Sequence, residues 1–280
     1  MGYEKKHEAL RGIGHHDDAI HAFEAMLLKM SESCDPEIRG EVITLYRHHF
    51  VENTPVERSR GYIRPEKTRE TIRIVIDDTI RDSPSMLINT TSGCLCNKLE
   101  QASTFETTST FTELISSMTT SINSARIKQE VGEYFRYATF SHKWEDNEPL
   151  FEKVINIVVY DLEGSPTHKK LQMFCKIVRE AGFNWAWSDT CCINKGDHFV
   201  LQEALVSMFK WYERSAMTII FLRGVPRLAL RGALTRNIWN MRAWTLQEYH
   251  ASRVVRIYTE DWTPYLGLDV YSEVQNRCNV

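Results

Sequence analysis

The 280-residue sequence has no run of about 18 apolar residues, the length that a membrane-spanning helix requires. It also has no excess of basic residues, since 34 Lys and Arg face 37 Asp and Glu. Nucleic acid and anionic membrane surfaces are therefore not expected partners. The first residues lack the apolar segment of a secretory signal peptide. We expect a soluble, cytoplasmic protein.

The cysteines follow no framework pattern. There are seven, an odd number, and reduced thiols are expected. The close pairs Cys94/Cys96 and Cys191/Cys192 have no matching Cys or His pair at zinc-site spacing, so no metal is expected. The G-x-G-x-x-G fingerprint is also missing, which argues against a dehydrogenase that holds a dinucleotide as a redox cofactor.

The N-terminal part of the sequence has helical periodicity. Apolar residues recur at helical spacing over residues 17–30, and further helices are expected after Pro36 and after Pro65. The third helix should stop before Pro84. Residues 1–82 are therefore predicted to be a helical region. The third helix should bury four apolar residues: Ile72, Val75, Ile76 and Ile80.

The pattern changes at residue 83. Two short apolar runs, residues 86–88 and 94–96, flank the polar segment 89–93, which predicts a β-hairpin. Residues 101–124 are rich in Ser and Thr, and we expect a loop there with a short helix at about 111–118.

The remaining sequence alternates strand and helix signals. Strands are expected at Tyr137–Ser141, Phe183–Ser188, Met217–Leu222 and Val254–Tyr258. Helices are expected at about 150–159, 171–181, 199–212 and 238–250. In the helix at 199–212, four residues should face the sheet: Leu201, Leu205, Met208 and Phe209. Alternation of this kind predicts right-handed crossovers and an open parallel sheet with helices on both faces.

Ligands of such sheets bind beyond the carboxyl ends of the strands, so residues that follow the strands are candidates. The cluster Ser141–Asp146 follows the first of these strands, and a polar loop with one aromatic anchor is its simplest interpretation. The cluster Trp187–Asn194 follows the second. Here Asp189 could simply cap the turn, and Cys191 and Cys192 could be small buried hydrophobes.

The third cluster is Arg242–Glu248. In a helix, Trp244 and Glu248 share a face at i, i+4, so the indole could form the wall of a pocket into which the carboxylate projects. A surface glutamate beside a core tryptophan is the alternative. A nucleophilic pair of Cys192 and His142 can also be assembled, although nothing in the sequence orients the base.

Together the clusters resemble the fungal heterokaryon-incompatibility (HET) domain, whose blocks run approximately YATLSYCWG, WIDSLCINQ and RGWTLQE. The corresponding segments are Tyr137–Trp144, Trp187–Asn194 and Arg242–Glu248. The hairpin at Pro84–Asn89 looks like the segment that commonly precedes this domain, so the resemblance covers residues 84 to about 260. We therefore expect a HET (TIR-like) domain over residues 83–280.

The sequence departs from these blocks at three positions. Lys143 replaces the usual Cys, Glu145 follows Trp144 where Gly is common, and Lys195 replaces Gln. Without that Gly, the first loop is less able to adopt a positive φ, so its path should differ from the family's.

HET domains are similar to TIR domains, which implies a flavodoxin-like sheet. The TIR pattern W-C-x-x-E has the spacing of Trp244 and Glu248, and active TIR domains use that glutamate to cleave the nicotinamide-ribose bond of NAD+. Nicotinamide departs neutral from a cationic pyridinium, so no general acid is required, and a lone carboxylate beside the cationic ribose suffices. Under this resemblance Glu248 is catalytic. Seven further residues are expected to bind substrate: Ser141, His142, Trp144, Asp189, Cys192, Arg242 and Trp244.

The leading hypothesis is an NAD+ glycohydrolase of a fungal incompatibility or innate-immunity cell-death system, with NAD+ as substrate and not as cofactor. Self-association into an oligomer is also expected, because TIR-like enzymes often need neighbouring copies to complete their site. One alternative is a noncatalytic TIR-like signalling domain that acts by homotypic assembly. Another is a hydrolase that depends on Cys192.

Overall fold

The computed structural model describes residues 62–227 and 232–265. The chain divides into two compact units at Tyr62/Ile63, and the second unit contains every element described below. The helices expected at 17–30 and after Pro36 lie outside the described residues. The helix expected after Pro65 is present as α4, Pro65–Ile80, and it buries the four apolar residues predicted to be inside. It belongs to the same unit as the sheet.

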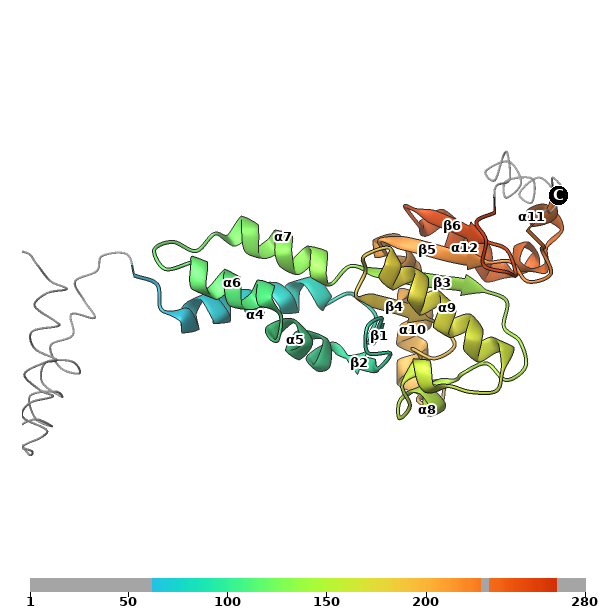
Figure 1. Ribbon diagram of the computed structural model, residues 1–280, viewed down its shortest axis with the longest axis horizontal. Helices are drawn as coiled ribbons and strands as arrows, with labels where there is room; N and C mark the ends of the chain where they lie inside the picture. The colour runs from blue at the N-terminus through green and yellow to red at the C-terminus, as the bar shows by residue number, and fades with distance from the viewer. Residues whose placement is uncertain (1–61, 228–231, 266–280) are drawn as a thin grey trace, which may run out of the picture. The chain divides into compact units, whose positions relative to one another are not determined.

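A single mixed sheet organises this unit (Figure 1). The strand order is β2-β1-β4-β3-β5-β6, in which β4, β3, β5 and β6 are parallel and β1 is antiparallel to both of its neighbours. This confirms the expected open, flavodoxin-like α/β fold. The strands are β1 Met86–Asn89, β2 Leu95–Asn97, β3 Tyr137–His142, β4 Trp185–Ser188, β5 Met217–Phe221 and β6 Val255–Tyr258.

The hairpin β1–β2 is confirmed, with Leu87 opposite Cys96. It is followed by three helices that pack with α4: α5 Lys98–Glu106, α6 Ser109–Ser117 and α7 Ser124–Tyr134. A loop was predicted from residue 101, but residues 101–106 are helical and belong to α5. A capping box between Asn97 and Glu100 starts α5 there, and its contribution outweighs the weak helix preference of the Ser and Thr residues.

Helices cover both faces of the sheet (Figure 1). Strand order and right-handed crossovers place α9, Pro166–Glu180, on one face, and α10, His198–Arg214, with α12, Ala243–Ala251, on the other. Side chains of β3 alternate accordingly. Phe140 stacks on Phe174 of α9 with 4.4 Å between ring centroids. Odd-numbered residues of β3 therefore face α10 and α12.

Two predicted helices are broken. The segment 150–159 forms a single turn, α8 Phe151–Val154, before the 3₁₀ turn η2 Val159–Asp161. The segment 238–250 begins as a 3₁₀ turn, η3 Ile238–Met241, and the backbone of Arg242 is then extended, with φ −85° and ψ 142°. A short helix, α11 Ala233–Arg236, precedes η3. The extended backbone at Arg242 separates η3 from α12, so that both elements can contact the end of β3.

The prediction for the inward face of α10 was partly wrong. Met208 is buried, but Leu205 and Phe209 are 39% and 45% exposed. The residues that α10 buries are Ala204, Met208, Trp211 and Tyr212. The two large aromatic side chains pack edge-on against Trp187 of β4, and this contact sets the rotation of the helix.

Phe105 lies at the centre of the aromatic cluster that joins α5 to α6 and α7. Its side chain is fully buried, and its ring centroid is 4.8 Å from that of Tyr134 and 5.7 Å from that of Phe135.

No helix in the described ranges is both long and apolar enough to cross a bilayer.

Because Phe105 is fully buried among aromatic side chains, replacing it with Ala should leave a cavity that its neighbours cannot fill. The free energy of unfolding should fall by about 3–5 kcal/mol. Chemical denaturation followed by circular dichroism measures the change. Leu99→Ala on the same helix is the control: its side chain is 81% exposed, and the loss should stay within about 0.5 kcal/mol. Equal losses in both variants would contradict this account of the core.

Candidate functional site

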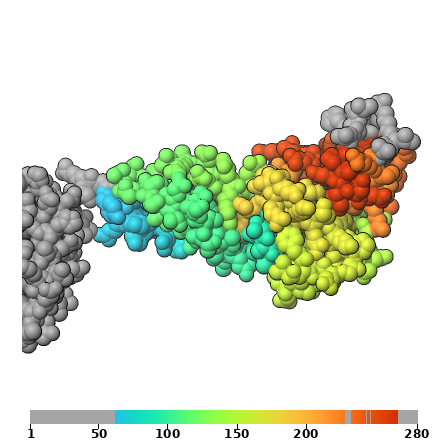
Figure 2. All heavy atoms as spheres, in the orientation of Figure 1, coloured from blue at the N-terminus to red at the C-terminus, as the bar shows by residue number. Residues whose placement is uncertain are grey.

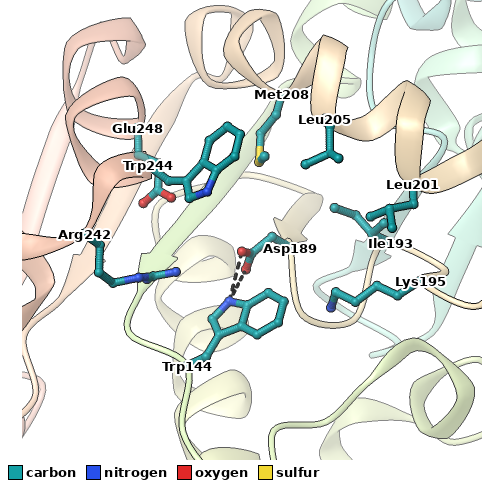
Figure 3. Close-up of a pocket in the computed structure, with 10 residues that line it drawn as sticks. All are labelled: Trp144, Asp189, Ile193, Lys195, Leu201, Leu205, Met208, Arg242, Trp244 and Glu248. Atoms are coloured by element: carbon teal, nitrogen blue, oxygen red, sulfur yellow. Dashed lines mark hydrogen bonds between the residues drawn. The ribbon is translucent and has the colours of Figure 1, made fainter.

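A cavity of about 280 Å³ opens at the carboxyl edge of the parallel strands, where such sheets bind ligands (Figure 3). Residues after β3 and β4 form part of its lining, and α10, α12 and Arg242, which directly precedes α12, supply the rest. We call it the Glu248 pocket. Ten residues line it: Trp144, Asp189, Ile193, Lys195, Leu201, Leu205, Met208, Arg242, Trp244 and Glu248.

Glu248 is the buried acid of this pocket. It lies on α12 and is only 4% exposed. Its Oε2 accepts a hydrogen bond from the hydroxyl of Ser141, the odd-numbered residue near the end of β3. The Ser141 Oγ in turn accepts from Trp239 Nε1 at 2.7 Å. An indole can only donate, so the Ser141 hydroxyl proton must point toward the Glu248 carboxylate.

A second line of hydroxyl groups fixes α12 on the sheet. Ser252 Oγ donates to the Glu248 backbone carbonyl at 2.5 Å, and it also lies 2.5 Å from Thr218 Oγ1 of β5. Thr218 Oγ1 is 2.6 Å from Thr139 Oγ1 of β3. The helix turn that carries Glu248 is therefore tied to the neighbouring strands β3 and β5, which restricts where its carboxylate can lie.

The environment of Glu248 favours its protonated form. Burial raises its pKa to about 7, the nearby Asp189 carboxylate adds to the rise, and the Ser141 hydrogen bond and Arg242 oppose it. Burial also raises the pKa of Asp189, while surrounding cations and the Trp144 hydrogen bond lower it. Two carboxyl groups with raised pKa values in one cleft are typical of a functional site.

Trp144 and Asp189 meet across the pocket floor. The indole Nε1 donates to both carboxylate oxygens of Asp189, at 2.9 and 3.1 Å (Figure 3). The Lys195 ammonium lies 4.1 Å from the centroid of the Trp144 ring and donates to the Thr190 carbonyl at 2.9 Å. The three side chains thereby connect the loops that follow β3 and β4.

Arg242 and Trp244 form the wall next to Glu248. The extended backbone of Arg242 precedes α12, and its Nη1 donates to the His142 carbonyl oxygen at the end of β3. Trp244 is 43% exposed and lines the cavity together with Glu248. The i, i+4 relation predicted for Trp244 and Glu248 is confirmed, and five of the eight predicted site residues line this one pocket.

Ser141 reaches the pocket only through Glu248, and His142 does not reach it. As an even-numbered residue of β3, His142 faces α9, and its Nε2 lies 3.5 Å from Glu148 Oε1. Lys170 of α9 donates to the same Glu148 oxygen at 2.5 Å. Burial lowers the pKa of His142, which favours the neutral imidazole. The structure therefore places His142, which was expected to bind substrate, away from the pocket lining: its imidazole belongs to a buried cluster on the other face.

Cys192 is also absent from the pocket lining. It is 2% exposed, and its Sγ accepts a hydrogen bond from the Ser188 amide at 3.4 Å. Burial raises the pKa of its thiol, and Cys191 raises it further. A neutral, enclosed thiol is a poor nucleophile, which counts against the Cys192/His142 pair. The structure thus places Cys192, which was also expected to bind substrate, in the core and outside the pocket lining.

Sequence reasoning missed Trp239 and the apolar wall. Trp239 lies in a 3₁₀ turn, and no spacing relates it to Ser141, 98 positions earlier. Leu201, Leu205 and Met208 were predicted on α10, but facing the sheet instead of the pocket. Among the described residues, no three His, Cys, Asp or Glu side chains gather in a metal-binding arrangement. Lys195 and Arg242 are the lining cations that could contact an anionic ligand.

The fold and the site together define a class of protein. It is a flavodoxin-like α/β protein with a buried glutamate in a pocket that is lined by tryptophans at the carboxyl edge of the sheet. Sequence comparison indicates what part of the chain is similar to within that class. Residues 137–227 match the family "Heterokaryon incompatibility protein (HET)". The match contains the first two of the three predicted blocks, Tyr137–Trp144 and Trp187–Asn194, and so supports the HET resemblance of this segment.

A curated relative agrees with this assignment. The chain is 30% identical over 138 residues to the "Vegetative incompatibility protein HET-E-1" of Podospora anserina, which covers 45% of this chain and 10% of that protein. The chain therefore spans about a tenth of the length of this relative. No solved structure matches.

The family match ends before the third block. It includes Ser141, Trp144, Asp189 and Lys195, but α12 with Glu248 follows it. α12 packs against α10, a helix of the matched segment. The space-filling view shows the red C-terminal part of the described chain lying against yellow atoms of the match (Figure 2). The hydrogen bond from Ser141 to Glu248 joins the two parts.

Glu248 should make stability depend on pH. Its pKa is near 4.5 when unfolded and about 7 when folded, so the folded state holds the proton more tightly. Wild-type stability therefore falls as pH rises through this window. Glu248→Gln, which resembles the neutral acid, should be more stable than wild type at pH 8 by up to about 3 kcal/mol, with no advantage below pH 4.

Urea unfolding at several pH values measures this difference. Glu213→Gln, an exposed glutamate on α10, is the control and should show no such trend. An advantage for Glu248→Gln that stays constant from pH 4 to pH 8 would contradict the assignment of the raised pKa.

Proposed function

We propose that this protein is an NAD+ glycohydrolase that acts in a heterokaryon-incompatibility response. The observation that carries the proposal is the burial of the Glu248 carboxyl in a pocket with two tryptophans, with a serine hydroxyl aimed at it. The HET domain and the similarity to an incompatibility protein support the biological role.

The proposed reaction needs one carboxylate. The C1′–N bond to nicotinamide breaks with its electron pair going to the ring nitrogen, which neutralises the pyridinium and leaves a cationic ribose. Water then adds to C1′ and loses a proton. The ionised Glu248 would stabilise the ribose cation and its hydroxyls, because a preorganised charge in a partly dry pocket is far more effective than one in water.

The pocket dimensions fit one end of the substrate. Cavities that enclose a drug-sized ligand usually measure about 300–1,000 Å³. At about 280 Å³, the Glu248 pocket would take a nicotinamide ring with its ribose, while the remainder of NAD+ extends outward. The half-exposed Trp244 and the Trp144 indole offer flat apolar surfaces next to that ring.

The direct test is nicotinamide release from NAD+ by purified protein, at concentrations high enough to permit assembly. Wild type should release nicotinamide, and Glu248→Gln should lose at least about a hundredfold in kcat, because a neutral amide cannot balance the ribose cation. Glu213→Gln should retain wild-type activity. Absence of release by wild type, or full activity in Glu248→Gln, would refute the proposal.

Ser141 should tune the pH dependence of this activity. The ionised form of Glu248 is the active one, so kcat/KM should rise with pH through about 7. The Ser141 hydrogen bond lowers the pKa of Glu248. Removing it in Ser141→Ala should move the rising limb to higher pH by about one pH unit. A pH–rate profile measures the shift; an unchanged midpoint with only a lower plateau would contradict this role.

A second candidate is a noncatalytic domain that acts by self-association. Two apolar side chains on α10 favour it, since Phe199 is 89% and Val206 82% exposed. Under this candidate, a cell-death assay would find Glu248→Gln fully toxic and Phe199→Ser inactive. Toxicity that disappears with Glu248→Gln favours the glycohydrolase.

A further inference from the structure

The charged groups of the Glu248 pocket are separated in space. Figure 3 shows Glu248 and Arg242 on one side, Asp189 in the middle and Lys195 on the opposite side. The wall between Glu248 and Lys195 is apolar and comes from Met208 and other residues of α10. An anionic group of a ligand would therefore meet Lys195 at the end of the pocket opposite Glu248, while the Glu248 carboxylate could face a cationic group of the same ligand.

The Lys195 ammonium forms no salt bridge with a carboxylate among the described residues. Its Nζ donates to the Thr190 carbonyl and lies over the Trp144 ring. An ammonium group has three N–H donors, so donors remain for a ligand. The Lys195 side chain is half-buried, and this partial desolvation lowers its pKa. A partly desolvated, unpaired cation at a pocket wall favours an anion.

We infer that Lys195 is the residue that selects substrates with a 5′-phosphate or diphosphate on the nicotinamide ribose. This inference rests on the proposed function. With C1′ of the ribose beside Glu248, the C5′ substituent of the same sugar leaves from the other side of the ring. In NAD+ that substituent is the diphosphate, and Lys195 lies across the pocket from Glu248.

The charge at this position is a property of this chain. In the HET block that the segment Trp187–Asn194 resembles, the next residue is usually Gln, which has no charge; here it is Lys195. A lysine presents a compact charge that suits a phosphate group without a fixed direction of approach. The glutamine of the block could donate a hydrogen bond but could not offset a phosphate charge.

A purely structural role makes a different prediction. Lys195 could merely hold Trp144 and the Thr190 turn together, in which case its loss would harm every substrate equally. The comparison between substrates with and without phosphate separates the two roles. NAD+ carries the diphosphate, whereas nicotinamide riboside ends in a 5′-hydroxyl.

The experiment measures nicotinamide release from both substrates by the full chain. Lys195→Gln should raise the KM for NAD+ by roughly tenfold to a hundredfold, the value of a lost hydrogen bond to a charged group, with little change in kcat. Its KM for nicotinamide riboside should change by less than about twofold. Lys195→Arg should retain most of the preference for NAD+. Lys210→Gln, an exposed lysine on α10, is the matched charge control.

A binding measurement separates failure of this inference from failure of the proposed function. Calorimetry with ADP-ribose needs no turnover, and wild type and Lys210→Gln should bind it about tenfold or more tightly than Lys195→Gln. No nicotinamide release by wild type would refute the glycohydrolase, while this binding difference would still support Lys195 as the phosphate contact. Equal losses on both substrates, or equal ADP-ribose binding by all variants, would overturn the inference.

Discussion

The hydrogen-bond relay Trp239 to Ser141 to Glu248 is the interaction on which the site depends. A carboxyl group that is 4% exposed needs polar partners, and the serine hydroxyl supplies one with its direction fixed by the indole N–H. Trp239 can donate to Ser141 only because the chain is extended at Arg242. In a continuous helix from Ile238, the helix geometry would fix the position of the Trp239 indole relative to the Glu248 carboxylate. The break lets η3 and α12 approach Ser141 independently.

The sheet supplies rigidity to this relay. Ser141 is on β3, which is hydrogen-bonded to parallel strands on both sides, and the hydroxyl line from Thr139 through Thr218 to Ser252 ties the backbone of Glu248 to the same strands. The carboxylate therefore has support at its side chain and at its main chain. Preorganisation of this kind is what an electrostatic catalyst requires, because no reorganisation energy is then spent during the reaction.

Much of this arrangement could be predicted from the sequence. Strand positions, the hairpin and the meeting of Trp144, Asp189 and Glu248 followed from apolar periodicity and from the geometry of parallel sheets. The errors have physical causes. Adjacent residues of a strand face opposite sides, so Ser141 and His142 could not both point at one pocket, and only the tertiary structure tells which face carries α12.

Other features depend on contacts that have no local signal. The rotation of α10 is set by large aromatic side chains that pack on β4, and it turns Leu205 toward the pocket instead of the sheet. The donor to Ser141 comes from an irregular turn 98 positions away. The start of α5, by contrast, did have a signal in the Asn97 and Glu100 capping box, which the Ser- and Thr-rich composition obscured.

A carboxyl group whose pKa is about 7 suits the proposed chemistry better than a permanently ionised one. An unpaired carboxylate in a dry pocket would destabilise the resting protein, and protonation relieves that cost. A cationic pyridinium that enters the pocket favours the ionised form, so substrate binding would itself release the proton. The charge would then be present when the ribose cation forms. The nearby Asp189 carboxylate contributes to this raised pKa, because repulsion between two carboxylates in one cleft favours protonation of one of them.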